Sequence, residues 1–249
     1  QPGRYTHSIV SYLPDRAYLS DWMKITDVID FFSDFYRDFD RVKATEMFKT
    51  LRISPLDRLK TLSKGTKEKV QLILTMSRRA QLYVLDEPSI GLHPSNIVGL
   101  TGVMHDLVAD GNSVILVDHD TQILKEADWI VEMGPEAGAK GGHVIAEGNI
   151  RMIEENPNSQ IGPFLSGKAE TKLRERAKKD ELFANGTVHL STSQIHTVKP
   201  LEVDIPKGRL TVVTGVSGSG KTTMVLESLV PALEAKINGN PLPAHIRSV

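Results

Sequence analysis

A run of small residues at positions 215–222 ends in a lysine and a threonine and reads Gly-Val-Ser-Gly-Ser-Gly-Lys-Thr. A valine-rich predicted strand at 210–214 leads into it, and a predicted helix from Lys221 to about residue 234 leads out. Glycines let backbone N–H groups point at phosphate oxygens, and a helix start adds its positive dipole end. The alternative, a surface turn with a chance lysine, does not account for this strand and helix. The run therefore predicts a phosphate-binding loop for a nucleoside triphosphate.

The residue types of this loop give roles to single side chains. Lys221 is expected to reach the β- and γ-phosphates, and the Thr222 hydroxyl is expected to ligate Mg²⁺. The predicted nucleotide-binding residues are Gly215, Ser217, Gly218, Ser219, Gly220, Lys221, Thr222 and Thr223.

A second group of polar residues follows the apolar run at 82–85. Asp86 and Glu87 come at the end of this predicted strand, which is where α/β sheets bind their ligands. Asp86 is expected to hold Mg²⁺ through water, and Glu87 to polarise the water that attacks the γ-phosphate. His119 follows the next predicted strand and is placed to contact the γ-phosphate. A helix-start carboxylate pair and a structural histidine are the plain alternatives, but the order and spacing of the residues favour the functional interpretation.

The composition is that of an ordinary globular protein, with 249 residues, 40% hydrophobic and 24% charged. Lys and Arg (30) nearly balance Asp and Glu (31), which disfavours non-specific binding of nucleic acid through a large net positive charge. The absence of cysteine excludes disulfides, thiol nucleophiles and Cys-ligated zinc in this stretch. No apolar run approaches the roughly 20 residues that span a bilayer, so a cytoplasmic location is expected. The first residue is Gln, so we expect the chain to be part of something longer.

Apolar strands alternate with helical segments along most of the chain, which is typical of an α/β fold. Strands are predicted at 7–13, 82–85, 113–117, 129–131, 143–145 and 201–205, and helices at 25–36, 40–51, 67–79, 96–109 and 121–127. Residues 168–181 are dense in both charge signs, which indicates a solvated helix or linker rather than a basic docking surface. A new domain is expected to begin near Thr187.

Three motifs in order resemble the ATP-binding cassette (ABC) ATPase family: Leu-Ser-Lys-Gly-Thr at 62–66, Leu-Asp-Glu-Pro at 85–88, and His119 after the next strand. The first lies before a predicted helix, a ready anion site. The resemblance implies that Ser63, Lys64 and Gly65 form the signature loop, Asp86 and Glu87 the Walker B pair, and His119 the switch histidine. Lys64 and Thr66 depart from the family's usual Leu-Ser-Gly-Gly.

Two resemblances within that family meet in this chain. Residues 85–249 resemble UvrA, the damage-recognition ATPase of nucleotide excision repair, and residues 8–84 resemble ATP-binding subunits of antibiotic exporters. The UvrA-like stretches are 85–93, 117–120, 127–131, 134–138 with 141–142, and 213–221, and the run Ser-Ile-Gly-Leu-His at 89–93 is quite specific. The exporter-like stretches are 11–15, 18–22 and 62–66.

The phosphate loop comes last, whereas an ordinary ABC module begins with it. UvrA holds two ABC modules in tandem, so the resemblance implies an ABC-ATPase-like (P-loop NTPase) fold with a helical signature subdomain, a linker, and the start of a second P-loop module. The expected parts are a signature subdomain (1–80), a Walker B and switch-histidine core (81–155), a charged linker (156–186) and a phosphate-loop segment (187–249). ABC modules associate head to tail, so the Ser63 loop is expected to face a phosphate loop, in this chain or between chains.

The leading hypothesis is the ATP-binding and ATP-hydrolysing part of a UvrA-like protein in excision repair, using ATP and Mg²⁺ and no zinc in this stretch. Its implied partners are a second ABC module, in cis or in a dimer, and, through the parent protein, DNA and other excision-repair proteins. The alternative is the ATP-binding subunit of an exporter, with a membrane permease as partner. A third reading is a nucleotide-binding fragment that does not turn over.

Overall fold

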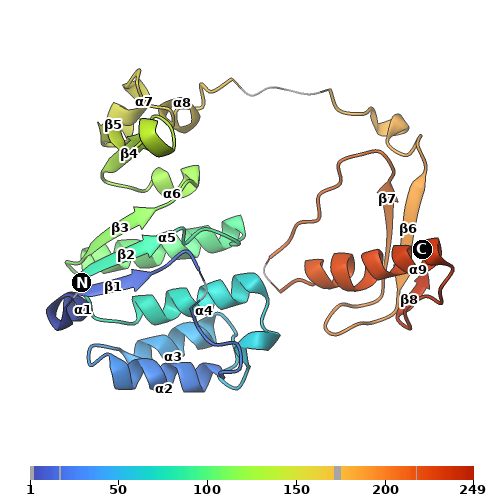
Figure 1. Cartoon of the computed structure of the whole chain (residues 1–249), viewed down its shortest axis with the longest axis horizontal. Coiled ribbons are helices and arrows are strands. Elements are labelled where there is room, and N and C mark those ends of the chain that lie inside the picture. Colours follow the sequence, from blue (N-terminus) through green and yellow to red (C-terminus); the bar gives the residue numbers. More distant parts are fainter. Residues whose placement is uncertain (1–2, 17, 171–174, 217) are drawn as a thin grey trace. The chain divides into compact units, whose positions relative to one another are not determined.

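The computed structural model describes residues 3–16, 18–170, 175–216 and 218–249 (Figure 1). It divides into two compact units, residues 1–171 (unit 1) and 172–249 (unit 2), and each unit is described here by itself. Within the described residues, no helix has the length and apolar character needed to cross a membrane. The four-part division at 80, 155 and 186 stays a prediction.

Unit 1 is built around a parallel sheet of three short strands in the order β1-β2-β3. The strands are β1 (Val10–Leu13), β2 (Leu82–Asp86) and β3 (Ser113–Val117). Parallel neighbours need long crossovers, and helices supply them here: α4 (Lys64–Met76) leads to β2, and α5 (Pro94–Ala109) leads to β3. The core between them holds Leu85 of β2 and Leu107 of α5, both almost fully buried.

The first strand is shorter than the prediction for 7–13, which was wrong over its first three residues. These residues lie in a helix, α1 (Arg4–Ile9), and the strand begins at Val10. The strand begins at Val10 because β2 pairs with β1 only from Leu82 to Leu85, opposite Val10 to Leu13. Residues before Val10 have no strand beside them in the described sheet, so a local helix forms instead.

A helical layer completes this part of unit 1. It consists of α2 (Ile25–Phe35), α3 (Arg41–Thr50), the short η1 (Leu59–Thr61) and the first turns of α4. The predicted helices at 25–36 and 40–51 are confirmed to within one residue at each end. The apolar residues of α2 recur every three or four positions and pack against α3 and α4 in one buried cluster. Its largest fully buried members are Ile25, Phe48, Leu59, Ile73 and Leu74.

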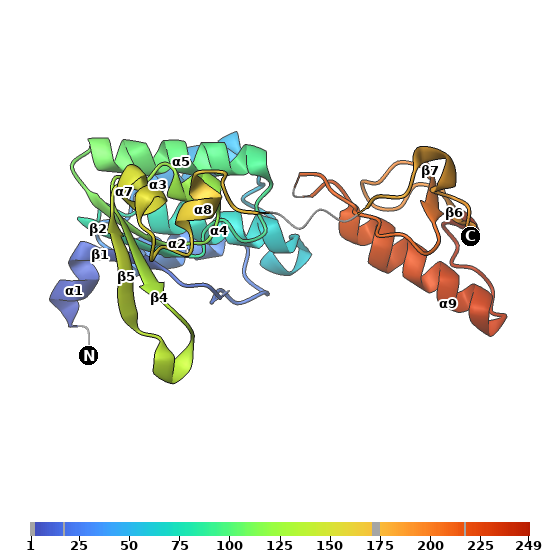
Figure 2. The same ribbon diagram turned by 90° about the horizontal axis from the view of Figure 1, so that it is seen from above.

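The rest of unit 1 is an antiparallel hairpin with short helices. After α6 (Thr121–Leu124) come β4 (Ile130–Gly134), η2 (Gly138–Lys140), β5 (His143–Gly148), α7 (Ile150–Glu155) and α8 (Gly162–Leu165). Figure 2 shows α5 along one side of the unit and the turn of this hairpin projecting on the opposite side. The Glu132 carboxylate on β4 accepts hydrogen bonds from the Ser159 hydroxyl and the Gln160 and Ile161 N–H groups, which fixes the turn between α7 and α8.

Unit 2 has an antiparallel sheet in the order β7-β6-β8, formed by β6 (Thr187–Thr192), β7 (Leu201–Pro206) and β8 (Ile246–Ser248). It is preceded by η3 (Lys179–Glu181), and one long helical segment packs on it. This segment starts as a π-helical stretch, η4 (Thr223–Leu229), and continues as α9 (Val230–Asn238). Pro231 explains the change, because its ring clashes with the carbonyl four residues earlier in a regular α-helix and the wider π turn relieves that clash.

The predicted strand at 210–214 is absent, and this prediction was wrong. The segment is extended, but no sheet of the described residues includes it. Its apolar side chains are largely in solvent: Leu210 is 93% exposed and Val212 is 75% exposed. A strand forms only where a neighbouring strand pairs with its backbone N–H and C=O groups. The described sheet of unit 2 consists of β7, β6 and β8, and none of them pairs with this segment.

Candidate functional site

The phosphate loop of unit 2 has a backbone that only glycines adopt easily. Gly215, Gly218 and Gly220 have φ angles of 147°, 81° and 90°. A Cβ on Gly215 would lie 2.8 Å from Oγ of Ser219, and a Cβ on Gly220 would collide with Cγ2 of Val198. The loop therefore curls tightly on itself and packs against the turn before β7. This glycine-built cradle fits the phosphate groups that the sequence motif predicts.

Lys221 stands at the start of the helical segment and bends back over the loop. Its Nζ donates hydrogen bonds to the carbonyl oxygens of Gly215, at 2.8 Å, and Val216, at 3.0 Å. An ammonium group held at the mouth of the loop is where a triphosphate needs a positive charge. Lys221 and the glycines of the loop therefore fit a nucleoside triphosphate. Ser217, the remaining predicted contact of the loop, lies outside the described residues.

The two threonines after Lys221 differ in their surroundings. Thr222 is exposed, which leaves its hydroxyl open to a cation in the role predicted for it. The Thr223 hydroxyl donates to Oε1 of Glu227 at 3.1 Å, and Oε2 of Glu227 lies 2.9 Å from Nε2 of His196. These hydrogen bonds, the one to His196 first, hold the pKa of Glu227 below its usual value. Thr223 is thus engaged with the protein's own carboxylate.

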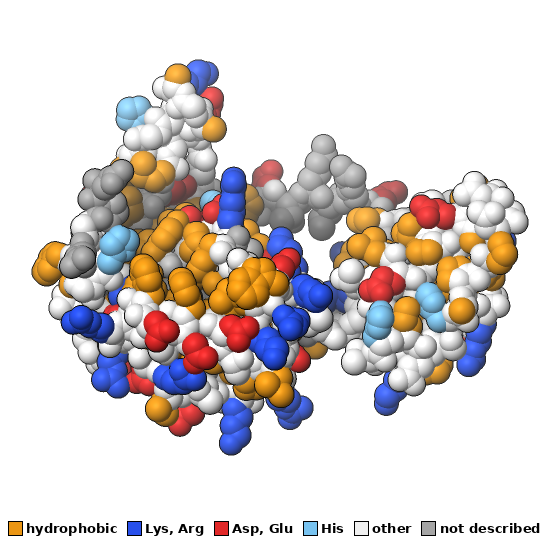
Figure 3. Space-filling view, turned by 60° about the horizontal axis from the view of Figure 1, so that its bottom comes forward, with side chains coloured by type: hydrophobic (Ala, Val, Ile, Leu, Met, Phe, Trp, Pro, Cys, Tyr) orange, Lys and Arg blue, Asp and Glu red, His pale blue; other side chains and the backbone are white. Residues whose placement is uncertain are grey.

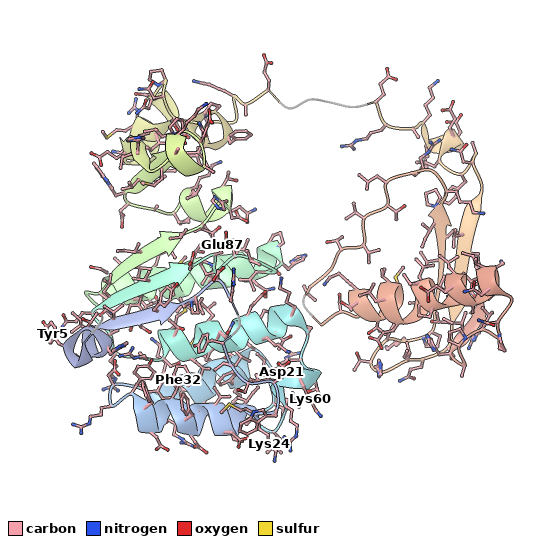
Figure 4. The ribbon with its side chains drawn as sticks, viewed as in Figure 1. Tyr5, Asp21, Lys24, Phe32, Lys60 and Glu87 are labelled. Atoms are coloured by element: carbon pink, nitrogen blue, oxygen red, sulfur yellow. The ribbon has the colours of Figure 1, made fainter. Side chains whose placement is uncertain are left out.

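The predicted Walker B pair, Asp86 and Glu87, lies at the carboxyl end of β2 in unit 1, and Figure 4 labels Glu87 there. Asp86 is the last residue of the strand, and its Oδ2 accepts a hydrogen bond of 3.4 Å from the Tyr12 hydroxyl on β1. Partial burial and the negative charge of Asp86 raise the pKa of Tyr12, so its phenol stays protonated. Tyr12 therefore contacts the carboxylate of Asp86, a contact that the sequence reasoning missed.

Glu87 follows with a left-handed backbone, φ 49°, which is uncommon for a residue that is not glycine. Its N–H donates to the carbonyl of Val117 at 2.7 Å, which ties it to the end of β3. His119 follows β3, and its Nε2 lies 3.7 Å from Oε1 of Glu87. Because β2 and β3 are parallel neighbours, their carboxyl ends bring these side chains together. The structure thus gathers Asp86, Glu87 and His119 at one edge of the sheet.

Two further residues join this edge, and sequence reasoning did not single them out. Asp118, directly before His119, accepts hydrogen bonds from Ser89, His119 and Asp120. Asp118 and Ser89 both stand inside the motifs, but nothing in their residue types showed that they meet across 29 positions of sequence.

The predicted signature loop, Ser63, Lys64 and Gly65, lies at the start of α4 in unit 1. Ser63 is the N-cap, and its Oγ accepts the Thr66 N–H at 3.2 Å. Lys64 is the first residue of the helix, and its Nζ lies 3.9 Å from Oε1 of Glu68. Gly65 follows in the first turn. The unusual Lys64 thus adds an exposed positive charge to a helix N-terminus that already favours anions.

The face of unit 1 that Figure 3 presents carries both acidic and basic side chains around a hydrophobic area. This agrees with the nearly neutral formal charge of -1 for the whole chain.

Comparison with known proteins supports the class that these sites suggest. The family model for an AAA domain (putative AbiEii toxin, Type IV TA system) matches residues 6–125. A solved ATP-binding subunit of an ABC transporter aligns over 66% of this chain and 70% of its own length, with a TM-score of 0.53 and 20% identity. The parallel sheet and this structural likeness show an α/β fold of the ABC-ATPase (P-loop NTPase) class.

Within that class the chain is similar to UvrA. It is 38% identical over 172 residues to UvrABC system protein A of Aquifex aeolicus and 40% identical over 192 residues to that of Micrococcus luteus. These alignments cover 68% and 76% of this chain but only 18% and 19% of the relatives. The crystal structure of UvrA2 from Deinococcus radiodurans superposes with a TM-score of 0.69 at 30% identity, over 87% of this chain and 30% of that one. The expected resemblance to UvrA is thus confirmed.

Proposed function

We propose that this chain is an ATP-binding and ATP-hydrolysing part of a UvrA-like protein that acts in nucleotide excision repair. The observation that carries the proposal is the glycine-built loop with Lys221 folded over it, in a chain up to 40% identical to UvrABC system protein A. The chain spans less than a fifth of the length of such relatives, so the repair activity belongs to the whole protein.

The proposed roles follow the positions of the side chains. The loop 215–222 holds the phosphates through its N–H groups and Lys221, and Thr222 together with a carboxylate of the Asp86 type holds Mg²⁺. Bound ATP and Mg²⁺ supply the γ-phosphoryl group and the cationic charge that the chemistry needs. Glu87 orients and polarises the attacking water, and His119 contributes a second polar contact beside it.

Each unit holds half of a catalytic set, so we infer that a second ABC module completes each site. The phosphate loop of unit 2 requires a Walker B pair and a signature loop, and the Walker B pair of unit 1 requires a phosphate loop. We propose, on the resemblance to ABC ATPases, that Ser63, Lys64 and Gly65 face the nucleotide of such a partner module, supplied by the same polypeptide or by a second copy. DNA and the other repair proteins would be engaged through the parent protein.

Steady-state hydrolysis of Mg²⁺-ATP, with and without double-stranded DNA, tests this proposal. Lys221→Ala is expected to lower the rate of hydrolysis at least about 100-fold, because the negative charge that develops on the phosphoryl group loses its stabilising cation. Lys199→Ala is the matched control: it removes an exposed lysine from the same unit and should leave the rate unchanged. Stimulation by DNA supports the repair function. A rate that survives Lys221→Ala contradicts the assignment of the loop.

An exporter subunit is the second candidate, and the exporter-like stretches at 11–15, 18–22 and 62–66 are what favour it. It predicts co-purification of the parent protein with an integral membrane permease. The higher identity to UvrABC system protein A favours the repair function over it.

A further inference from the structure

The carboxylate of Asp118 joins two loops that are far apart in sequence. Its Oδ1 accepts hydrogen bonds from the Ser89 hydroxyl at 2.7 Å, the His119 N–H at 2.7 Å and the Asp120 N–H at 2.8 Å. Its Oδ2 accepts the Ser89 N–H at 3.2 Å. Asp118 and Ser89 are both half-buried, at the carboxyl ends of β3 and β2.

These bonds enclose Glu87 from both sides. Ser89 lies two residues after Glu87, and the Glu87 N–H is itself bonded to Val117, directly before Asp118. Glu87 therefore sits in a short span fixed to β3 at both ends. Such fixation is needed, because the left-handed backbone of Glu87 is strained for a residue that has a Cβ.

We propose that Asp118 is a positioning residue that holds Glu87 and His119 together for hydrolysis; this inference rests on the function proposed above. A purely local turn-forming role explains the bonds to His119 and Asp120, which are its chain neighbours. It does not explain the two bonds to Ser89. Those bonds fix the loop of the water-polarising carboxylate to the loop of the histidine, and a shift of one against the other would break the 3.7 Å contact between Glu87 and His119.

Asp118→Asn separates the local turn-forming role of Asp118 from its link to the Ser89 loop. The amide oxygen keeps an acceptor for His119 and Asp120, whereas the new NH₂ group faces the Ser89 N–H and repels it. Ser89→Ala removes only the hydroxyl bond and is a milder second variant. Asp120→Asn is the matched control, because it makes the same chemical change two positions on and keeps an N-cap for α6.

The variants are compared in the full chain by two readouts. Asp118→Asn is expected to lower kcat for ATP hydrolysis by roughly 10- to 100-fold with KM within about twofold. The Ser89 amide should exchange with solvent at least about tenfold faster, and the His119 ring-proton NMR signals should shift, while the amides of Val84 and Leu116 in the strands stay as protected as before.

An unchanged kcat overturns the proposal, and so does a loss of protection that spreads over β2 and β3, because Asp118 would then be a fold-stabilising residue. If the wild-type chain shows no Lys221-dependent turnover, the proposed function has failed instead. The His119 ring signals then decide alone: signals unmoved in Asp118→Asn overturn the positioning role, and shifted signals support it.

Discussion

Oε1 of Glu87 lies 3.7 Å from Nε2 of His119, although 31 residues and a whole helix separate them along the chain. The contact exists because β2 and β3 are parallel neighbours whose carboxyl ends meet at one edge of the sheet. It joins the residue proposed to polarise water with the histidine of the following loop.

Glu87→Gln keeps the shape of the side chain but removes its charge. We expect the rate of ATP hydrolysis to fall by about 10²–10⁴-fold, the usual contribution of a general base, while ATP affinity is retained. Glu126→Gln is the matched control, because Glu126 forms a similar pair with His105, at 3.1 Å, on the exposed surface of the same unit. Steady-state hydrolysis and equilibrium binding of a fluorescent ATP analogue measure the two effects. Equal losses in both variants would refute a special role for Glu87.

Gly220→Ala and Gly218→Ala should differ in their affinity for an ATP analogue, although both glycines have positive φ angles. Alanine at 218 meets nothing within 4 Å, so only the backbone strain of about 1–2 kcal/mol remains. Alanine at 220 also collides with the methyl group of Val198. We expect the larger loss of ATP-analogue affinity for Gly220→Ala, with part of it restored by the double variant Gly220→Ala/Val198→Ala. The reverse ranking would show that the packing of Val198 does not shape the loop.

Asp40 makes the free energy of unfolding of unit 1 depend on pH in the acidic range. Its carboxylate caps α3 by accepting the Lys43 N–H and also pairs with Arg79, and these contacts lower its pKa below the ordinary 3.8. The ionised form therefore stabilises the native state above about pH 4, and this contribution disappears as the pH falls through the lowered native value. Asn at position 40 keeps the cap but has no charge to lose.

Urea unfolding between pH 3 and 7, followed by tryptophan fluorescence, measures this effect, because both tryptophans (Trp22 and Trp129) belong to unit 1. The advantage of the wild type over Asp40→Asn should shrink toward pH 3. A constant difference across this range would mean that the charge of Asp40 contributes nothing.

Arg78→Ala should destabilise unit 1 far more than loss of a surface arginine. Arg78 is 4% exposed, pairs with Asp38 at 2.9 Å, and donates to the carbonyl oxygens of His7 and Val10. Its removal leaves a half-buried carboxylate and two carbonyl groups without their partner, which lowers the free energy of unfolding by about 3–5 kcal/mol. Arg151→Ala breaks only an exposed pair with Glu155 and should cost at most about 1 kcal/mol. Urea unfolding reports both, and similar values would rule out a buried ion pair as a main support of this unit.

Sequence alone predicted what depends on local pattern. The alternation of apolar runs with helical stretches predicted the α/β fold, and the strand at 113–117 was placed with its observed bounds. The positive φ angles of Gly215, Gly218 and Gly220 agree with the tight turn that the sequence predicted, whereas the binding of phosphate by this loop stays a prediction.

What the sequence did not predict depends on distant partners. The segment 210–214 has the composition of a strand, but pairing needs a neighbour, and the described sheet of unit 2 does not supply one. The role of Asp118 depends on a hydrogen bond across 29 residues, which no local pattern encodes. The left-handed backbone of Glu87 is likewise set by its bond to Val117 and not by its residue type.

The exposed segment 210–214 has a consequence for handling the protein. An extended, uncharged Leu-Thr-Val-Val-Thr stretch with open backbone groups is a template for edge-to-edge pairing between molecules, which is the first step of β-aggregation. Lys207 and Arg209 stand directly before it, in the place where charged residues act as gatekeepers against such pairing. Solubility of the isolated chain should therefore fall with rising salt, as the repulsion between these charges is screened.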